Sequence, residues 1–287
     1  MSTLPAMPVL EPSWQDWLAG SVVGGKTDEE MLATMLASNF DESYAKVAIN
    51  VVRSMTERVQ AQNPSMLGQY LPDPHRLPKT PVVRAADKDI VINFTLDNPN
   101  IAVISGILSP DECRKMIQLS SGKMQRSFVV EKDTGKLEVS DVRRSDGCHF
   151  EKAENAIVQR LEQRIAALTG IPVEQGEPLQ ILHYHETGEY LPHHDYFADH
   201  LDGSAQHVVR GGQRIATMVI YLSTVAEGGD TYFPDLELTV KPYVGSAVYF
   251  EYHNSSGQLD SRCLHAGMPV TKGDKWIATK WFRASAY

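Results

Sequence analysis

The sequence has little cysteine and no long apolar run, and these two absences exclude several classes of protein. Its three cysteines, Cys113, Cys148 and Cys263, are an odd number without regular spacing, so they predict no disulfide framework. No stretch approaches the roughly 18 consecutive apolar residues of a membrane span. The first residues also lack the basic segment followed by an apolar one that is typical of a signal peptide. We therefore expect a reduced, soluble, cytoplasmic protein.

Positive charge is also scarce relative to negative charge. The 27 Lys and Arg residues are outnumbered by 36 Asp and Glu residues, which gives a formal net charge of −9 and a pI near 5.6. A chain with this balance has no general affinity for phosphate backbones, so we expect neither nucleic acid nor a membrane as a partner. With 287 residues, the chain is long enough for one large domain and a smaller appendage.

The first part of the chain has a helical pattern. Apolar residues such as Met31 and Met35 recur at helical spacing between Trp14 and about Arg58, and they form one stripe on each predicted helix. We interpret this stripe as the core of a small helical cap or as a subunit contact in a homodimer. Residues 62–86 are rich in proline and predict a linker. The predicted division is therefore an N-terminal helical region with its linker, residues 1–86, and a main domain, residues 87–287.

The main domain begins with helices and continues with short strands. Residues 109–112, Ser-Pro-Asp-Glu, form a capping box that starts a helix, and a second helix is expected from about Ala153 to Leu168, ending at Gly170. After Pro178, short apolar runs alternate with turns and predict strands near residues 179–185, 190–195, 214–222, 230–240, 246–251, 262–270 and 276–284. This order predicts an α+β fold that is mainly β, with a jelly-roll core buttressed by helices.

The most informative stretch is His193-His194-Asp195. In a strand, residues i and i+2 share a face, so His193 and Asp195 point the same way. An imidazole and a carboxylate side by side are two of the three ligands of the facial triad that holds non-haem Fe(II). For the third ligand we favour His265, because Gly267 beside it permits a close backbone approach. Other histidines compete with it, and we expect them on the surface or around the site: His183, His185, His200, His207 and His253.

A lysine follows the candidate third ligand at the start of the last predicted strand. Lys275 at the mouth of an apolar barrel would be costly to bury without an anion. A dicarboxylate such as 2-oxoglutarate would supply this anion, with its keto acid end on the iron and its far carboxylate on Lys275. The alternative interpretation of Lys275 is a solvated lysine after a turn.

Further motifs occur in a fixed order along this part of the chain: Tyr190 to Phe197, Gly211 to Thr217, Glu227 to Pro234, His265 to Val270 and Gly273 to Trp281. Together they closely resemble the prolyl 4-hydroxylases, which are Fe(II)- and 2-oxoglutarate-dependent oxygenases with a double-stranded β-helix core. The resemblance covers about Ile101 to Phe282, and the N-terminal helical region lies outside it.

The resemblance implies a complete set of cofactor residues. It assigns the iron to His193, Asp195 and His265, and the far carboxylate of 2-oxoglutarate to Lys275. The hydroxyls of Tyr184 and Thr231 are the expected helpers, and Thr217 is a weaker candidate. It also implies O2 as the second co-substrate and ascorbate as a reductant. An enzyme of this kind hydroxylates an unactivated C–H bond.

The substrate residues implied by the resemblance include one departure. The Arg-Thr-Ser strand of the family is represented here by Arg143, Arg144 and Ser145, and in peptide-binding members arginines matching Arg143 and Arg214 line the substrate groove. The expected substrate residues are Arg143, Ser145, Arg214, Trp281 and Arg283, the last in a position where the family has a histidine. Residues 198–212 form either a substrate lid or an ordinary surface loop.

Three functions follow from these residues. The first is hydroxylation of a prolyl residue in a peptide or protein. The second is hydroxylation of a free amino acid or another small metabolite, with Arg283 holding the substrate carboxylate. The third is an inactive binding module on the same fold, which the complete triad together with Lys275 disfavours.

Overall fold

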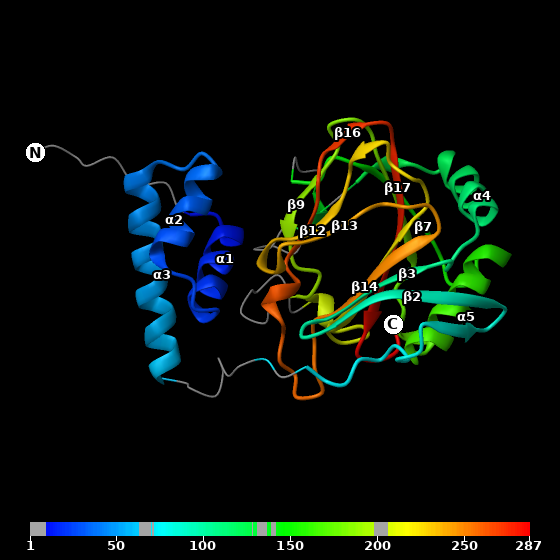
Figure 1. Cartoon of the computed structure of the whole chain (residues 1–287), viewed down its shortest axis with the longest axis horizontal. Helices are drawn as coiled ribbons and strands as arrows, with labels where there is room; N and C mark the ends of the chain where they lie inside the picture. Colours follow the sequence, from blue (N-terminus) through cyan, green and yellow to red (C-terminus); the bar gives the residue numbers. More distant parts are fainter. Residues whose placement is uncertain are drawn as a thin grey trace, which may run out of the picture. The chain divides into compact units, whose positions relative to one another are not determined.

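The computed structural model describes residues 10–62, 70, 72–127, 129–130, 137–138, 142–197 and 206–287. The chain forms two compact units, Met1–Gln69 and Tyr70–Tyr287 (Figure 1). Of the predicted linker, residues 62–86, Gln62 thus ends α3 of the first unit, whereas the described residues from Tyr70 onward belong to the second unit. The reason is that they make specific contacts there: Leu77 is buried in its core, and the carboxylate of Asp73 accepts hydrogen bonds from Ser255.

The first unit contains three described helices: α1 (Pro12–Val23), α2 (Asp28–Ala37) and α3 (Glu42–Gln62). A capping box between Thr27 and Glu30 starts α2. The buried side chains of this unit form a core of their own, made of Leu18, Val22, Met31, Met35, Ala45, Ala48 and Ile49. The methionine-containing stripe is therefore the core of the helical unit. No described helix of the chain is long and apolar enough to cross a membrane.

The second unit is built around two antiparallel sheets. The larger sheet has the order β1-β2-β3-β14-β10-β17-β8-β7-β4. Its strands are β1 (Val82–Ala85), β2 (Lys88–Asp97), β3 (Asn100–Ser105), β4 (Gln125–Arg126), β7 (Asp146–Phe150), β8 (Leu179–Tyr184), β10 (Arg214–Tyr221), β14 (Ser246–Glu251) and β17 (Lys275–Arg283). The second sheet has the order β13-β12-β15-β9, with β9 (Tyr190–His193), β12 (Thr231–Phe233), β13 (Leu238–Val240) and β15 (His265–Gly267).

Two short strand pairs, two α-helices and three 3-10 helices complete the described part of this unit. The 3-10 helices are η1 (Val173–Gln175), η2 (Pro234–Leu236) and η3 (Ser261–Cys263). The pairs are β11 (Glu227–Gly228) with β16 (Val270–Lys272), and β5 (Val129–Val130) with β6 (Leu137–Glu138). The α-helices are α4 (Pro110–Ser121), which begins at the predicted capping box, and α5 (Ala156–Thr169), which begins and ends close to the predicted positions. Gly170 ends α5 in the left-handed conformation, with φ of 71°, as its glycine predicted. The predicted class, mainly β with a jelly-roll core buttressed by helices, is confirmed.

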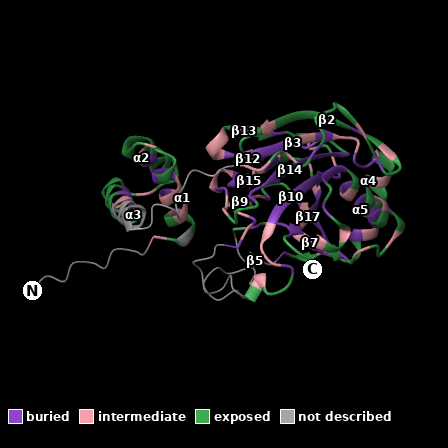
Figure 2. Ribbon diagram, turned by 90° about the horizontal axis from the view of Figure 1, so that it is seen from below, coloured by how far each residue is buried: buried purple, intermediate pink, exposed green. Residues whose placement is uncertain are grey.

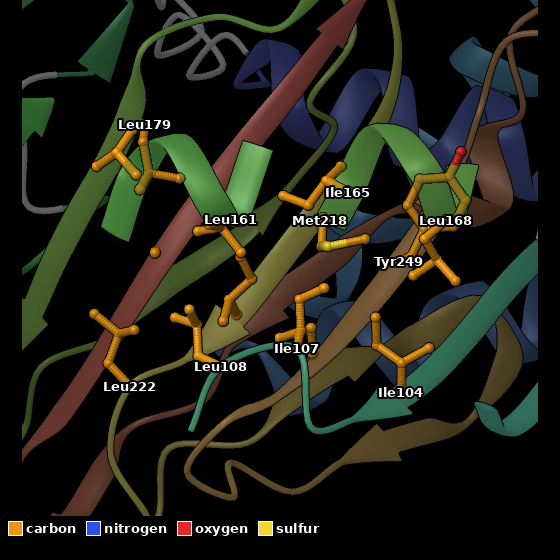
Figure 3. Packing of buried hydrophobic residues seen from close by; sticks show 14 of the residues in the cluster. Ile104, Ile107, Leu108, Leu161, Ile165, Leu168, Leu179, Met218, Leu222 and Tyr249 are labelled. Atoms are coloured by element: carbon orange, nitrogen blue, oxygen red, sulfur yellow. The ribbon is translucent and has the colours of Figure 1, made fainter. Parts of the chain in front are cut away.

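Strand β10 shows why the sequences of the central strands are almost continuously apolar. It is buried along almost its whole length (Figure 2), because both faces of the large sheet are covered at this central strand. Met218 and Ile220 belong to the core that includes Leu161 and Ile165 of α5 (Figure 3). Val219 and Tyr221 belong to a second core, which includes Phe233 of the smaller sheet. Alternation along β10 thus directs Val219 and Tyr221 toward the smaller sheet, whereas Met218 and Ile220 point to the side of α5.

Candidate active site

The three predicted iron ligands come together at one end of the smaller sheet. His193 ends β9 and His265 begins β15, and the antiparallel register places them directly opposite each other. The Nε2 atoms of His193 and His265 each lie 3.6 Å from a different oxygen of Asp195. One ligand atom from each residue lies within 4.8 Å of the other two. Strand pairing, rather than nearness in sequence, therefore brings the distant histidine to the His-x-Asp motif.

Backbone carbonyl groups orient both histidine rings. His193 Nδ1 lies 2.9 Å from the Leu191 carbonyl oxygen, and His265 Nδ1 lies 3.0 Å from that of Cys263. With the ring proton on Nδ1 and donated to these carbonyls, each Nε2 keeps its lone pair free for a metal. Burial, together with the neighbouring His265, holds the pKa of His193 well below its ordinary value. His193 is therefore neutral, as a metal ligand must be.

Asp195 is fixed by hydrogen bonds to its carboxylate and to its backbone. Thr217 Oγ1 donates to Asp195 Oδ2 at 2.7 Å, and Arg214 Nη1 donates to the Asp195 carbonyl at 3.1 Å. Burial alone would raise the pKa of Asp195, but the neighbouring His265, His193, Arg214 and Thr217 together lower it below its ordinary value. The side chain is therefore an oriented anion, and the three residues form the donor set of a facial Fe(II) site.

Aromatic rings pack against the two histidines. Tyr190 stacks on His193 with ring centroids 3.5 Å apart and an interplanar angle of 20°, and Phe250 meets His265 edge-on at 4.7 Å. These rings limit the rotation of the imidazoles and exclude water from the sides of the site that they cover. Tyr190 belongs to one of the motifs that carry the resemblance. Phe250 belongs to none of them, and its apolar strand predicted only a core residue.

Lys275, Tyr184 and Thr231 line the same cavity as the triad. Lys275 lies directly opposite Tyr184 in the pairing of β17 with β8, and it is only 2% exposed. Within the described part of the chain its Nζ forms no hydrogen bond or ion pair, and it lies 5.4 Å from the centroid of the Tyr184 ring. Burial lowers the pKa of Lys275 to about 8. Thr231 accepts a hydrogen bond from the Tyr221 hydroxyl at 2.8 Å, which leaves its own proton free to donate. A buried lysine beside hydroxyl groups fits an anionic carboxylate.

The cavity lies between the two sheets, and both contribute to its wall. Its lining residues are Arg143, Leu182, Tyr184, Tyr190, His193, Asp195, Val219, Thr231, His265, Ala266, Gly267, Lys275, Ile277, Thr279 and Trp281. The cavity therefore holds the triad, the buried lysine and two of the predicted substrate residues, Arg143 and Trp281.

Arg143 and Trp281 each present an unpaired donor. Arg143 Nη2 donates to Gln180 at 2.8 Å and its guanidinium lies 4.9 Å from the Tyr190 ring centroid. Its Nε, however, is buried without a hydrogen-bond partner, as is the indole Nε1 of Trp281. Such donors are costly to leave unsatisfied, so they are suited to a bound group that carries oxygen acceptors.

The other predicted substrate residues do not line the cavity. Ser145 donates a hydrogen bond to Ser127 at 2.9 Å. Arg214 forms two hydrogen bonds with Glu177, at 2.7 and 2.9 Å, and its guanidinium lies 4.0 Å from the Trp281 ring centroid. Arg214 therefore supports the wall of the cavity from behind.

Arg283 is also engaged elsewhere, which contradicts its interpretation as an anchor for a substrate carboxylate. It is 3% exposed, and its Nε donates to Glu177 at 2.6 Å. Its Nη1 donates to the carbonyls of His207 and Gly212 at 2.9 and 2.6 Å. All these acceptors belong to the chain itself, so the guanidinium of Arg283 is already engaged within the protein.

Sequence reasoning missed several supporting residues. Glu177, which pairs with both Arg214 and Arg283, precedes β8 in a segment with no recognisable pattern. Gln180 lies in β8 and Tyr252 directly follows β14. In such apolar segments nothing in the sequence separates a supporting polar group from an ordinary strand residue. Residues 198–205 of the predicted lid lie outside the described residues, so the lid stays a prediction.

Known proteins match this site and fold. Residues 179–283 match the family model described as the 2OG-Fe(II) oxygenase superfamily. Over 204 residues the chain is 42% identical to prolyl 4-hydroxylase 1 of Arabidopsis thaliana, an alignment that covers 66% of this chain and 70% of the relative. The chain belongs to the prolyl 4-hydroxylase family of 2OG-Fe(II) oxygenases.

Two further similarities agree with this assignment. Probable prolyl 4-hydroxylase 3 of Arabidopsis thaliana is 38% identical over 208 residues, which is 66% of this chain and 71% of the relative. The solved structure of a viral collagen prolyl hydroxylase from Paramecium Bursaria Chlorella virus-1, in complex with 2OG, is 26% identical, with a TM-score of 0.51. That match covers 64% of this chain and 96% of the viral chain. The enzyme is a dioxygenase that uses Fe(II), 2-oxoglutarate and O2.

The residues of the chain divide the catalytic work between them. Bound iron, with 2-oxoglutarate and O2, supplies the oxidising chemistry that hydroxylates an unactivated C–H bond. The two Nε2 atoms and the Asp195 carboxylate would hold the ion. Lys275 would compensate the far carboxylate of 2-oxoglutarate, and the neighbouring Thr231 hydroxyl is free to donate a hydrogen bond to it.

Proposed function

We propose that this enzyme hydroxylates prolyl residues in a peptide or protein. The observation that carries the proposal is the 42% identity with prolyl 4-hydroxylase 1 of Arabidopsis thaliana. The similarity to the viral collagen prolyl hydroxylase supports it. A prolyl ring carries no charge and offers no hydrogen-bond donor, so its recognition depends on the apolar wall of the cavity and on contacts to the neighbouring peptide groups.

Two residues of the cavity are suited to bind a peptide backbone. The Nε of Arg143 and the Nε1 of Trp281 are buried donors without partners, and both residues line the cavity together with His193. Peptide carbonyl groups would satisfy these donors, and each such hydrogen bond removes the cost of an unsatisfied buried group. We assign Arg143 and Trp281 to substrate binding and Arg214 to the positioning of Trp281.

The second candidate function is hydroxylation of a free amino acid or another small metabolite. Arg283 was the feature that favoured it, and the ion pair of Arg283 with Glu177 removes that support. Arg143 keeps one unpaired donor in the cavity, and a small anionic substrate could accept a hydrogen bond from it in place of a peptide carbonyl group. The test must therefore include both substrate classes.

We also propose that the enzyme works in the cytoplasm and uses ascorbate as a reductant. The three cysteines are buried and unpaired, and burial raises the pKa of the Cys113 thiol to about 11. Such thiols are inert and need no oxidising compartment.

The experiment measures succinate formation. The protein is first loaded with Fe(II) under anaerobic conditions, and it is then given 2-oxoglutarate, O2 and each member of a substrate panel. The panel contains proline-rich peptides, matched peptides with alanine in place of proline, and free amino acids. We expect only the proline peptides to stimulate succinate release, with mass spectrometry locating one added oxygen on a prolyl residue. Stimulation of succinate release by free amino acids alone would favour the second candidate function. Absence of succinate in every arm would leave only the binding module.

A further inference from the structure

A second group of metal-binding side chains lies outside the catalytic cavity. Asp146 on β7, His183 on β8 and His185 directly after β8 place one ligand atom each within 4.8 Å of the others. Asp274 Oδ1 lies 3.0 Å from His183 Nε2 and 3.3 Å from His185 Nδ1. None of these four residues lines the catalytic cavity. We propose that Asp146, His183 and His185 bind a divalent metal ion of the zinc class.

The strand register explains how this cluster forms on the outer face of the large sheet. Asp146 lies directly opposite His183 in the pairing of β7 with β8. His183 and His185 are two residues apart, so their side chains share a face, and their rings lie 3.9 Å apart. Tyr184 between them points to the other face and lines the catalytic cavity. The sheet therefore separates the cluster from the iron site.

One distance within the cluster already matches the spacing of ligands around a small ion. Zinc takes four ligands at about 2.0–2.1 Å, so its ligand atoms lie about 3.3 Å from one another. His185 Nε2 lies 3.3 Å from Asp146 Oδ2, which is one such edge. Asp274 approaches the other ring nitrogen of His185 at 3.3 Å, which is the position of a carboxylate that orients a ligating histidine. Two imidazoles with carboxylates favour zinc over magnesium or calcium, which prefer ligand sets made only of oxygen.

The cluster is partly fixed and partly open. The His183 ring stacks on Trp276 with centroids 3.9 Å apart and an interplanar angle of 14°. Its side chain is 14% exposed, whereas the side chains of His185 and Asp146 are 62% and 36% exposed. Packing thus positions one ligand in advance, and the other two are accessible to an ion from solvent. Within the described residues, the iron triad is the only other group of this kind.

An ion in this cluster would tie β7 to the end of β8. Tyr184 belongs to that end of β8, and it is paired with Lys275, which directly follows Asp274. The cluster therefore lies behind the two residues assigned to 2-oxoglutarate. A ligand that binds only the folded state raises its stability, so zinc is expected to raise the melting temperature of the protein through this cluster.

The test uses the full chain with His193→Ala and His265→Ala, so that the iron triad cannot take up the added zinc. Zinc bound at equilibrium is measured by dialysis and metal analysis, and the melting temperature is followed as zinc is added. A matched protein also carries Asp146→Asn and His185→Gln, which remove two ligands with little change in shape. A third carries His253→Ala instead, as a histidine of the same unit outside the cluster.

We expect the triad-deficient protein to bind one zinc ion and to melt at a higher temperature as zinc is added. Asp146→Asn with His185→Gln should weaken this binding at least tenfold and remove the increase, whereas His253→Ala should change neither. Binding of no zinc by the triad-deficient protein would overturn the proposal, because the histidine–aspartate hydrogen bonds would then be the whole role of the cluster. Zinc binding that is unchanged by Asp146→Asn with His185→Gln would also overturn the proposal. Neither readout depends on hydroxylation, so the result is independent of the proposed substrate.

Discussion

The hydroxyl group of Thr217 donates a hydrogen bond to Asp195 Oδ2 at 2.7 Å, and it lies 2.9 Å from the hydroxyl of Tyr252. Because the Thr217 proton is directed to the carboxylate, Tyr252 is the donor in the second hydrogen bond. The resulting chain, Tyr252 to Thr217 to Asp195, is buried. It fixes the rotation of the only anionic ligand of the triad.

Replacing Thr217 with valine should therefore weaken iron binding while keeping the side-chain volume. Loss of a hydrogen bond to a ligating carboxylate costs about 10–100-fold in metal affinity or activity. We expect Thr217→Val to lower Fe(II) affinity within that range, measured as the dependence of succinate formation on Fe(II) concentration in the presence of O2 and 2-oxoglutarate. Thr217→Ser keeps the hydroxyl and should retain most of the affinity. Equal behaviour of the two variants would mean that the hydroxyl does not support the site.

Each triad residue should be essential for turnover but not for folding. We expect His193→Ala, Asp195→Ala and His265→Ala to abolish succinate formation, because two remaining ligands do not hold Fe(II) in an active geometry. The triad lies at the wall of a cavity rather than in the main apolar core, so circular dichroism of the variants should match that of the wild type. Turnover at the wild-type rate in any variant would remove that residue from the iron site.

Lys275 should make 2-oxoglutarate binding dependent on pH. Its pKa in the free enzyme is lowered by burial to about 8, and an anion bound beside it favours the charged form. Above this pKa the lysine must take up a proton when 2-oxoglutarate binds, so the KM for 2-oxoglutarate should rise with pH, by at most about tenfold per pH unit. Below this pKa the KM should be independent of this group.

Two variants of Lys275 separate charge from other effects. Lys275→Arg stays charged throughout this range, so its KM for 2-oxoglutarate should be flat where that of the wild type rises. Lys275→Ala should raise the KM at every pH and abolish the dependence. A pH profile of Lys275→Ala that matches the wild type would show that another group titrates.

The sequence predicted the parts of this site that depend on strand alternation and on ordered motifs. The spacing of His193 and Asp195 was sufficient to place both on one side. The residues around His265 and Lys275 made these two the favoured candidates, and the resemblance then assigned their roles. Glu177 could not be predicted, because its role depends on two arginines that β10 and β17 bring to it from later in the chain. The same pairing explains the error at Arg283: a cation at a groove position resembles a substrate anchor until its buried counter-ion is known.

The proline-rich segment shows a similar limit. Proline excludes helix and central strand, and on that basis alone residues 62–86 predicted a linker. Tertiary contacts decide whether such a segment is free or packed, and Leu77 is buried at 3% exposure. A single apolar residue between prolines gives no periodic pattern, so this docking has no local signal in the sequence.

Glu177 should be a major determinant of stability although it does not line the cavity. Its carboxylate pairs with Arg214 at 2.7 Å and with Arg283 at 2.6 Å, and both arginines are largely buried. Removing one partner of a buried ion pair leaves an uncompensated charge, which costs about 3–5 kcal/mol, so Glu177→Gln should lower the free energy of unfolding by that amount in a urea titration. The exposed pair of Arg84 with Asp89 is the matched control, and Asp89→Asn should change this free energy by less than about 1 kcal/mol.

The arginines hold the pKa of Glu177 below its ordinary value, so this stabilisation should be complete above the ordinary glutamate pKa and should disappear as the pH falls through the lowered one. A Glu177→Gln protein as stable as Asp89→Asn would show that solvent already compensates the two arginines.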